Sequence, residues 1–276
     1  MTLLMPDALT IATWNINSVR ARREQVAAFL DGWQPDVLCL QETRCPTDAF
    51  PARFFRKLGY AHQAIIGRKG HAGVAILSRL PIAAQASQRF CGMDDARHVM
   101  ARIAGVEIHS LYVPAGGDVP DAGSNPKFAH KLAFLDELHD WLAGRTQQAA
   151  RNGHEVVLTG DLNVAPLPDD VWDHKKLLRV ITHTPMETER LEAIRRHATM
   201  YDVIRQHLPP PQKVFTWWSY RGGADWQLHD KGRRLDHIWA TPALAGRCTE
   251  VAIARETRGW PRPSDHVPVL ARFSLA

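Results

Sequence analysis

The sequence predicts a protein of the α/β class in which mixed or antiparallel β-sheets are covered by helices. Short apolar runs bounded by turn residues recur along the chain, and several follow one another with only short connections. Helical patterns lie between some of these runs but do not alternate strictly with them, which disfavours a purely parallel sheet. The 276 residues, 45% of them hydrophobic, can bury a sizeable core. Because no linker or repeat divides the chain, residues 1–276 are expected to form one domain.

Strands are expected where apolar runs lie between turn signals. In chain order these runs are Leu9–Trp14, Asp36–Gln41, Gly73–Ser78, Val106–Val113, Glu155–Thr159, Leu235–Ala240, Glu250–Ala254 and Val267–Phe273.

Apolar residues at helical spacing predict three helical regions. The first carries Val26, Phe29, Leu30 and Trp33, with Asn17 or Ser18 as its N-cap and Pro35 beyond its end. The second opens at Pro126 and places Phe128, Leu132, Leu135, Leu138 and Leu142 along one side. The third, over residues 187–208, is expected in two pieces and stops at the prolines 209–211.

Charge and composition favour a soluble cytoplasmic protein with a polyanionic partner. The formal net charge is +5, which is compatible with nucleic acid but does not specify it. The cysteines Cys39, Cys45, Cys91 and Cys248 show neither a C-x-x-C pair nor zinc-like spacing with histidine, so free thiols are expected. The N-terminus lacks the pattern of a signal peptide, and no apolar run approaches the roughly 18 residues of a membrane span. We expect no membrane association, and a monomer.

Polar residues interrupt the apolar runs at the ends or starts of the predicted strands. A strand end and the start of an antiparallel neighbour share one edge of a sheet, so these side chains are expected to converge on one rim. Any one of them alone is an ordinary turn residue, but the placement recurs eight times. The eight residues are Asn15, Glu42, Tyr112, Asp161, Asn163, Asp236, Asp265 and His266.

These side chains form an oxygen-rich set without thiolates, which suits Mg²⁺ or Mn²⁺ better than zinc. A metal ion, a carboxylate base and neutral or cationic donors are also what phosphate-ester hydrolysis requires. A carboxylate partner would keep His266 protonated, and that partner is either Asp265 or Asp236. The chain has no G-x-S-x-G, H-E-x-x-H, P-loop or G-x-G-x-x-G motif, so the competing chemistries lack support.

Eight blocks, in order and spanning nearly the whole chain, resemble the exonuclease III branch of the AP endonuclease family, within the endonuclease/exonuclease/phosphatase superfamily. They are TWNINSVRAR at Thr13–Arg22, LQET at Leu40–Thr43, KGHAGVAILSR at Lys69–Arg79, YVPAGG at Tyr112–Gly117, GDLNVAP at Gly160–Pro166, TWWSYR at Thr216–Arg221, GRRLDHIWA at Gly232–Ala240 and SDHVPV at Ser264–Val269. GD-x-N or SDH alone is moderately specific, and the ordered set is very specific.

The resemblance implies a DNase I-like, four-layer sandwich of two mixed β-sheets flanked by helices. It implies a Mg²⁺-dependent DNA repair phosphodiesterase, with Mn²⁺ as an alternative ion, that acts on double-stranded DNA at abasic sites or 3′ ends. Glu42 would be the principal metal ligand, with Asn15 and Asp236 near the metal. Asp161 would orient or deprotonate the attacking water, and Asn163 would hold it. His266, supported by Asp265, would contact the scissile phosphate, while Tyr112 would bind phosphate or protonate the leaving group. Asp161, Asn163, Asp265 and His266 are also candidate metal ligands.

Basic residues beside these blocks are candidate DNA contacts. One group, Asn17, Arg20, Arg22 and Arg23, is expected to begin the first helix, where phosphate binds well. A second, Arg68, Lys69 and His71, lies in a glycine-rich loop, and a third, Arg221, Lys231, Arg233 and Arg234, flanks a tryptophan-rich segment. Each group could equally be a solvated surface. In the family a tryptophan of the matching block lines the pocket for a sugar without its base, and Trp217 and Trp218 are both open candidates for that role.

The sequence leaves two alternative functions to weigh: a phosphodiesterase with a different substrate, and a DNA-binding protein without catalytic activity. A phosphodiesterase of the same superfamily could act on RNA or small phosphoesters, but the NSVRAR and TWWSYR segments argue against it. A silent DNA-binding module would have lost some of the eight polar residues, and none is missing. Residues 167–184 and 222–230 are the least family-like, so the sequence leaves open the balance between abasic-site cleavage and 3′→5′ exonuclease activity.

Overall fold

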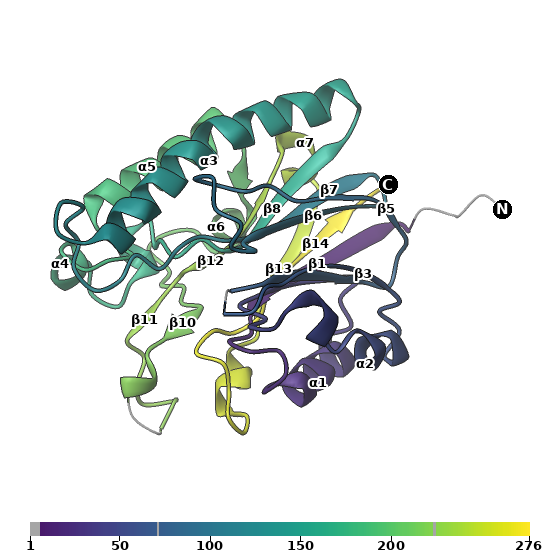
Figure 1. Cartoon of the computed structure of the whole chain (residues 1–276), viewed down its shortest axis with the longest axis horizontal. Coiled ribbons are helices and arrows are strands. Elements are labelled where there is room, and N and C mark those ends of the chain that lie inside the picture. Colours follow the sequence, from purple (N-terminus) through teal and green to yellow (C-terminus); the bar gives the residue numbers. More distant parts are fainter. Residues whose placement is uncertain (1–5, 71, 223–224) are drawn as a thin grey trace.

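Two mixed six-stranded β-sheets pack face to face in the computed structural model, which describes residues 6–70, 72–222 and 225–276 (Figure 1). The first sheet has the spatial order β13 (Cys248–Ile253), β14 (Val269–Ser274), β1 (Ala8–Asn15), β2 (Val37–Gln41), β4 (Val74–Ser78) and β3 (His62–Ile66). The second has the order β5 (Ile82–Ala86), β6 (His98–Ile103), β7 (Val106–Tyr112), β8 (Glu155–Asp161), β12 (Asp236–Ala240) and β9 (Tyr201–Asp202). The expected mixed sheets are confirmed.

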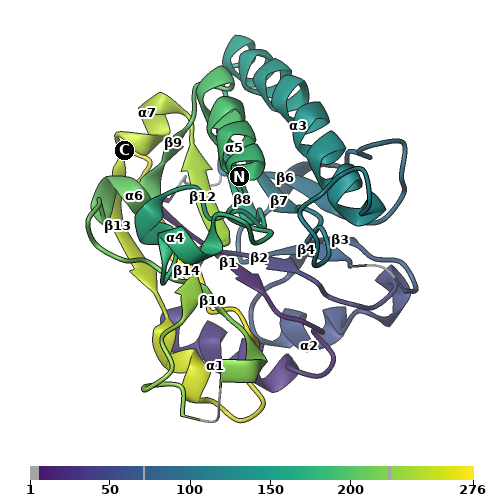
Figure 2. The ribbon, with the colours of Figure 1, turned by 90° about the vertical axis from the view of Figure 1, so that its left-hand side faces the viewer.

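Helices cover the outer faces of both sheets and complete four layers (Figures 1 and 2). The helices are α1 (Arg23–Trp33), α2 (Ala52–Lys57), α3 (Pro126–Arg151), α4 (His174–Leu177), α5 (Pro185–His197), α6 (Val203–His207) and α7 (Pro242–Ala245). A short hairpin of β10 (Trp217–Trp218) and β11 (Gly232–Arg233) stands apart from the sheets. Short 3-10 turns span Thr47–Ala49, Pro168–Asp170, Tyr220–Gly222 and Arg255–Gly259. No helix in the described part of the chain is long and apolar enough to cross a membrane.

Buried apolar side chains fill the three spaces between the layers. Ile11, Ile76 and Ile108 lie in the cluster shared by the two sheets. Leu138 joins the cluster between the second sheet and the α3–α5 layer, and Phe29 joins the cluster between the first sheet and the α1–α2 layer. This arrangement explains why both faces of the central strands are apolar in the sequence.

All eight strands expected from the sequence are present to within a few residues at each end. The sequence missed β3, β5 and β6, because β3 and β5 are partly exposed edge strands and β6 carries His98 and Arg102 among its apolar residues. The helix at Pro126 is confirmed, with Asn125 accepting from the backbone N–H of Lys127 as its N-cap. The pair α5 and α6 confirms the two helical pieces.

The predicted cap of α1 is wrong. The helix begins at Arg23 and its N-cap position, Arg22, makes no side-chain capping bond. Asn17 and Ser18 instead occupy left-handed backbone conformations, with φ of 46° and 87°, in the turn that leads from β1. That turn carries Asn17 toward the rim of polar residues described below, where its side chain donates to Asp265.

Candidate active site

The sheet pairing brings the predicted polar residues to one end of the sandwich. In the first sheet β1 and β2 run parallel, and Asn15 pairs with Gln41 at their common end. Glu42, which follows Gln41, therefore lies at the same edge as Asn15. In the second sheet Asp161 at the end of β8 lies opposite Asp236 at the start of antiparallel β12. The expected sharing of one rim by strand ends and strand starts is confirmed.

Asp161 lies at the centre of this group. Its Oδ2 accepts hydrogen bonds from the amide nitrogens of Asn15 (2.9 Å) and Asn163 (3.1 Å), and its Oδ1 accepts from the backbone N–H of Asn163 (2.9 Å). Only 1% of Asp161 is exposed, and this burial raises the pKa of its carboxyl group. A buried carboxylate with a raised pKa is a stronger base near neutral pH.

A glycine is required immediately before Asp161. Gly160 has φ of +136°, and a Cβ atom built there would lie 2.0 Å from the carbonyl oxygen of Leu111 on β7. The close approach of β7 and β8 therefore depends on the glycine of the GDLN segment.

His266 is held between two carboxylates. Its Nδ1 donates to Oδ2 of Asp236 at 2.8 Å, and its Nε2 lies 3.6 Å from Oδ2 of Asp161. Burial alone would lower the pKa of His266, but the charges of Asp236 and Asp161 outweigh it and raise the pKa to about 10. The imidazole is therefore protonated at neutral pH and can donate a charge-assisted hydrogen bond.

Of the two carboxylates open from the sequence as the partner of His266, Asp236 makes the hydrogen bond, while Asp265 acts on His266 through its charge alone. Asp265 turns away: its Oδ1 accepts from the Asn17 amide nitrogen (3.0 Å) and its Oδ2 from the indole N–H of Trp217 (3.1 Å). The hydrogen-bond partner of His266 therefore comes from the start of β12.

Glu42 and Tyr112 complete the rim. Oε1 of Glu42 accepts from the hydroxyl of Tyr112 (2.9 Å) and from the amide of Asn15 (2.9 Å), while Oε2 forms an ion pair with Arg44. Burial, together with the charges of Glu42 and Asp161, raises the pKa of Tyr112 well above its usual value. The phenol is therefore neutral and available as a proton donor.

The donor set fits a divalent cation. Among the described residues, Asp161, Asp236 and His266 offer ligand atoms within 4.8 Å of one another, all of them buried. Oδ1 of Asp236 is buried and has no hydrogen-bond partner. A buried carboxylate oxygen without a partner is costly unless a cation or donor satisfies it. Oxygen ligands from Asp236, Asp161 and Glu42 suit Mg²⁺ or Mn²⁺.

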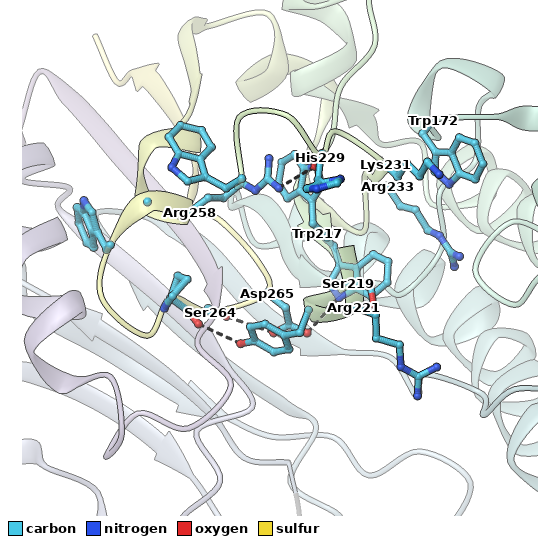
Figure 3. A pocket seen from close by; sticks show the side chains of 16 residues that line it. Trp172, Trp217, Ser219, Arg221, His229, Lys231, Arg233, Arg258, Ser264 and Asp265 are labelled. Atoms are coloured by element: carbon cyan, nitrogen blue, oxygen red, sulfur yellow. Dashed lines mark hydrogen bonds between the residues drawn. The ribbon is translucent and has the colours of Figure 1, made fainter. Parts of the chain in front are cut away.

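A cavity of about 720 Å³ opens beside this rim, with Asp265 and Ser264 in its wall (Figure 3). Trp217 and Trp218 both line it, together with Trp172, Arg221 and Arg233. The backbone of Trp217 pairs with His266, and the backbone N–H of Trp218 donates to the carbonyl of Asp265. The β10–β11 hairpin therefore places the aromatic cavity directly next to Asp265 and His266.

The candidate DNA contacts divide into exposed and buried residues. Arg20, Lys69 and Arg221 are exposed, Arg22 binds the Tyr220 hydroxyl (3.0 Å), and His71 lies outside the described residues. Arg20, Arg22 and Asn17 precede α1 rather than begin it. Arg234 contradicts its expected role, because it is fully buried and bonds Asp170 (2.6 Å) and Asp202 (2.7 Å). It holds the fold together and does not reach DNA.

Several supporting residues were missed by sequence reasoning. The hydroxyl of Ser264 donates to the carbonyl of Asn15 (2.7 Å), and the Arg97 guanidinium lies 4.9 Å from the centre of the Tyr112 ring. Ser264 and Arg44 could have been found, since each sits in or beside a quoted block. No sequence pattern pointed to Arg97, because only the pairing of β6 with β7 brings this residue to Tyr112.

Comparisons with known proteins agree with this geometry. The Endonuclease/Exonuclease/phosphatase family matches residues 12–266. The chain is 30% identical to exodeoxyribonuclease III of Haemophilus influenzae, over 95% of this chain and 98% of that protein. Among solved structures it resembles the 3′-5′ exonuclease NExo of Neisseria meningitidis (32% identity, TM-score 0.87, 96% and 100% of the two chains). It also resembles an AP endonuclease of Archaeoglobus fulgidus (32% identity, TM-score 0.86, 96% and 99% of the two chains).

Proposed function

Because this chain belongs to the endonuclease/exonuclease/phosphatase family, we propose that it is a Mg²⁺-dependent DNA repair phosphodiesterase with 3′→5′ exonuclease, abasic-site endonuclease and 3′-end-cleaning activities. Similarity to exodeoxyribonuclease III, NExo and an AP endonuclease supports a DNA phosphodiester hydrolase. The observation that supports the chemistry most directly is the buried group of Asp161, Asp236 and His266. The proposed substrate of the protein is double-stranded DNA with abasic sites or 3′ ends, and the proposed location of the protein is the cytoplasm.

The proposed metal ligands are the oxygens of Glu42, Asp236 and Asp161. When bound, the ion would polarise the phosphoryl group and stabilise the leaving oxygen. His266 is not a ligand in this proposal, because a protonated imidazole has no free lone pair.

The side chains of the rim, Asp161 among them, divide the work of hydrolysis. Asp161 takes a proton from the attacking water, and Asn163, fixed by its bond to the carbonyl of Val113 (2.9 Å), orients that water. Protonated His266 donates to a non-bridging oxygen of the phosphate as negative charge builds there. Tyr112, neutral before the step, donates its phenolic proton to the leaving oxygen, and the resulting phenolate regains a proton from solvent after product leaves.

The cavity is the proposed binding site for the nucleotide next to the cleaved bond. Trp217 is bonded to Asp265 and half-buried, whereas Trp218 is only 6% exposed and packs on Phe215. We therefore assign the sugar-contacting role to Trp217 and a supporting role to Trp218. Asn17, Arg20, Arg22, Lys69 and Arg221 are the proposed contacts to the DNA backbone.

A substrate panel tests the proposal. Purified protein with Mg²⁺ is incubated with an abasic-site duplex, a 3′-phosphate duplex, a 3′-recessed duplex, single-stranded DNA and RNA, and each reaction is repeated with EDTA. We expect Mg²⁺-dependent cleavage of the first three substrates. Intact abasic and 3′-recessed duplexes would contradict the function, and cleavage that persists in both Glu42→Ala and Asp161→Asn would contradict the site.

A further inference from the structure

Two histidines face each other on the outer layer of the molecule, far in sequence from every residue of the catalytic rim. His139 belongs to α3 and His197 ends α5, and these two helices lie side by side over the second sheet (Figures 1 and 2). Their imidazole rings stack with centroids 4.2 Å apart and planes only 3° from parallel. The pair is accessible from solvent, since His197 is exposed and the side chain of His139 is 35% exposed.

A carboxylate fixes the tautomer of one of these histidines. Nδ1 of His139 lies 2.8 Å from Oδ1 of Asp140. A carboxylate can only accept, so Nδ1 carries a proton, and in the neutral form of the ring the lone pair is on Nε2. This carboxylate–imidazole arrangement is the one that orients histidine ligands in metal sites.

We propose that His139 and His197, oriented by Asp140, form a binding site for a divalent transition-metal ion such as zinc, separate from the catalytic centre. The ligand atoms of the three residues already lie within 4.8 Å of one another. Ligands of a tetrahedral zinc ion are about 3.3 Å apart, given Zn–N bonds of about 2.0 Å. Because the lone pair of an imidazole lies in the ring plane, both exposed side chains must rotate out of the parallel stack before each can direct a nitrogen at one ion. Imidazole nitrogen selects zinc, nickel or copper, whereas Mg²⁺ requires oxygen ligands.

The site would connect two helices that already share an ion pair. Arg190 of α5 bonds Asp136 of α3 at 2.8 Å, one helical turn before His139. This pair is exposed and contributes little to stability by itself. A metal ion coordinated by both helices would bind the folded protein only, so it would raise the melting temperature.

The test is a zinc titration of the full chain in saturating Mg²⁺, followed by NMR of the histidine ring protons and by thermal melting. We expect the His139 and His197 resonances to shift together at one equivalent of zinc and the melting temperature to rise by several degrees. The His197→Gln variant should lose both responses, and Asp140→Asn should weaken zinc binding by about 10- to 100-fold. Both variants should retain the Mg²⁺-dependent nuclease activity.

The matched control is His62→Gln, which removes a half-buried histidine from β3 and should leave the zinc response unchanged. Unshifted His139 and His197 resonances, or an equal rise in melting temperature in His197→Gln and the wild type, would overturn the proposal. Neither outcome bears on the proposed nuclease function, which the substrate panel tests separately.

Discussion

At the scale of single residues, the chemistry of the rim depends on which carboxylate holds His266. Asp236 reaches Nδ1 at 2.8 Å while Asp161 lies 3.6 Å from Nε2, so one proton is fixed on Nδ1 and the other faces the catalytic carboxylate. Asp265 instead accepts from Trp217, which fixes the wall of the cavity. Two adjacent residues of the SDH segment thus serve two different parts of the site.

Asp236→Asn should narrow the pH range of the enzyme. The pKa of His266, about 10 in the folded protein, should fall toward its ordinary value of about 6.5 when the charge of Asp236 is removed. The protonated donor would then be lost as pH rises through neutrality, and cleavage at pH 8 should drop by up to about 30-fold, since only about 3% of an imidazole of that pKa is protonated there. A profile of kcat from pH 6 to 10 measures this. An alkaline limb shifted equally by Asp265→Asn would contradict the assignment.

The two tryptophans of the cavity should respond differently to truncation. Trp218→Ala removes a buried ring that packs on Phe215 and should cost about 3–5 kcal/mol of unfolding free energy, measured in urea. Trp217→Ala should cost less stability but raise KM for the abasic duplex, because base or sugar stacking contributes about 1–3 kcal/mol. Equal effects of both variants on KM, at unchanged stability, would show that Trp218 also contacts the substrate.

At the scale of elements, the loop after β8 is supported from beneath by α3 and by the segment before α5. The fully buried Lys131 donates to the carbonyl of Asn163 (2.7 Å) and forms an ion pair with Glu187 (2.5 Å). Glu187 in turn accepts from the backbone N–H groups of Thr182 and Thr184. Asn163 has φ of +52°, so its left-handed conformation depends on such support.

Breaking the Lys131–Glu187 pair should therefore affect both stability and turnover. Lys131→Met leaves a buried carboxylate without its cation and should cost about 3–5 kcal/mol. The double variant Lys131→Met/Glu187→Gln should be less destabilised than the sum of the single changes, as measured by urea unfolding. kcat should fall in all three while KM changes little, because Asn163 is displaced. Additive losses would contradict the coupling.

A second buried network joins the short elements around β12. Arg234 lies between Asp170 and Asp202, and Arg205 also bonds Asp170. Burial alone would raise the pKa of Asp170 and of Asp202, but Arg234 outweighs it and lowers the pKa of both carboxyl groups. Their stabilising contribution is present above the unfolded pKa of about 3.9 and is lost as pH falls below it toward the lower folded values.

Arg234→Met should destabilise the protein strongly at pH 7, by about 3–5 kcal/mol, and less at pH 3, where the two carboxyl groups can take up protons. Urea unfolding at the two pH values measures this difference. The matched control is Arg221→Ala, which changes an exposed arginine. This variant should leave the free energy of unfolding unchanged but reduce the salt dependence of DNA affinity. Arg234→Met should not change that salt dependence in the folded protein. A normal unfolding curve for Arg234→Met would contradict the structural role.

At the scale of the whole molecule, the site lies where the ends of two packed sheets meet. The first sheet and the segments that flank β2 and β14 supply Asn15, Glu42 and His266, and the second sheet supplies Tyr112, Asp161 and Asp236. Neither sheet alone assembles the set, so the packing between them fixes the distances across the rim. The three apolar clusters that hold the layers together involve none of these carboxylates.

Removal of metal should therefore abolish cleavage without unfolding the protein. With EDTA we expect unchanged far-UV circular dichroism and no activity, and readdition of Mg²⁺ should restore it. Mg²⁺ should also raise the melting temperature slightly, because it binds only the assembled carboxylates, and Asp161→Asn should lose that rise. Loss of secondary structure in EDTA would mean that the ion is required for the fold.

The sequence by itself determined most of the strands, the principal helices and the identity of the rim residues. Buried strands and amphipathic helices are encoded in local apolar patterns, and the polar segments GDLN and SDH stand where β8 ends and shortly before β14 begins. Edge strands such as β3 and β5 were missed because partial exposure weakens that pattern. The tertiary structure alone decided that Asp236 holds His266, that Arg234 is buried and that Lys131 supports Asn163. Each of these depends on contacts between distant segments, which no local pattern specifies.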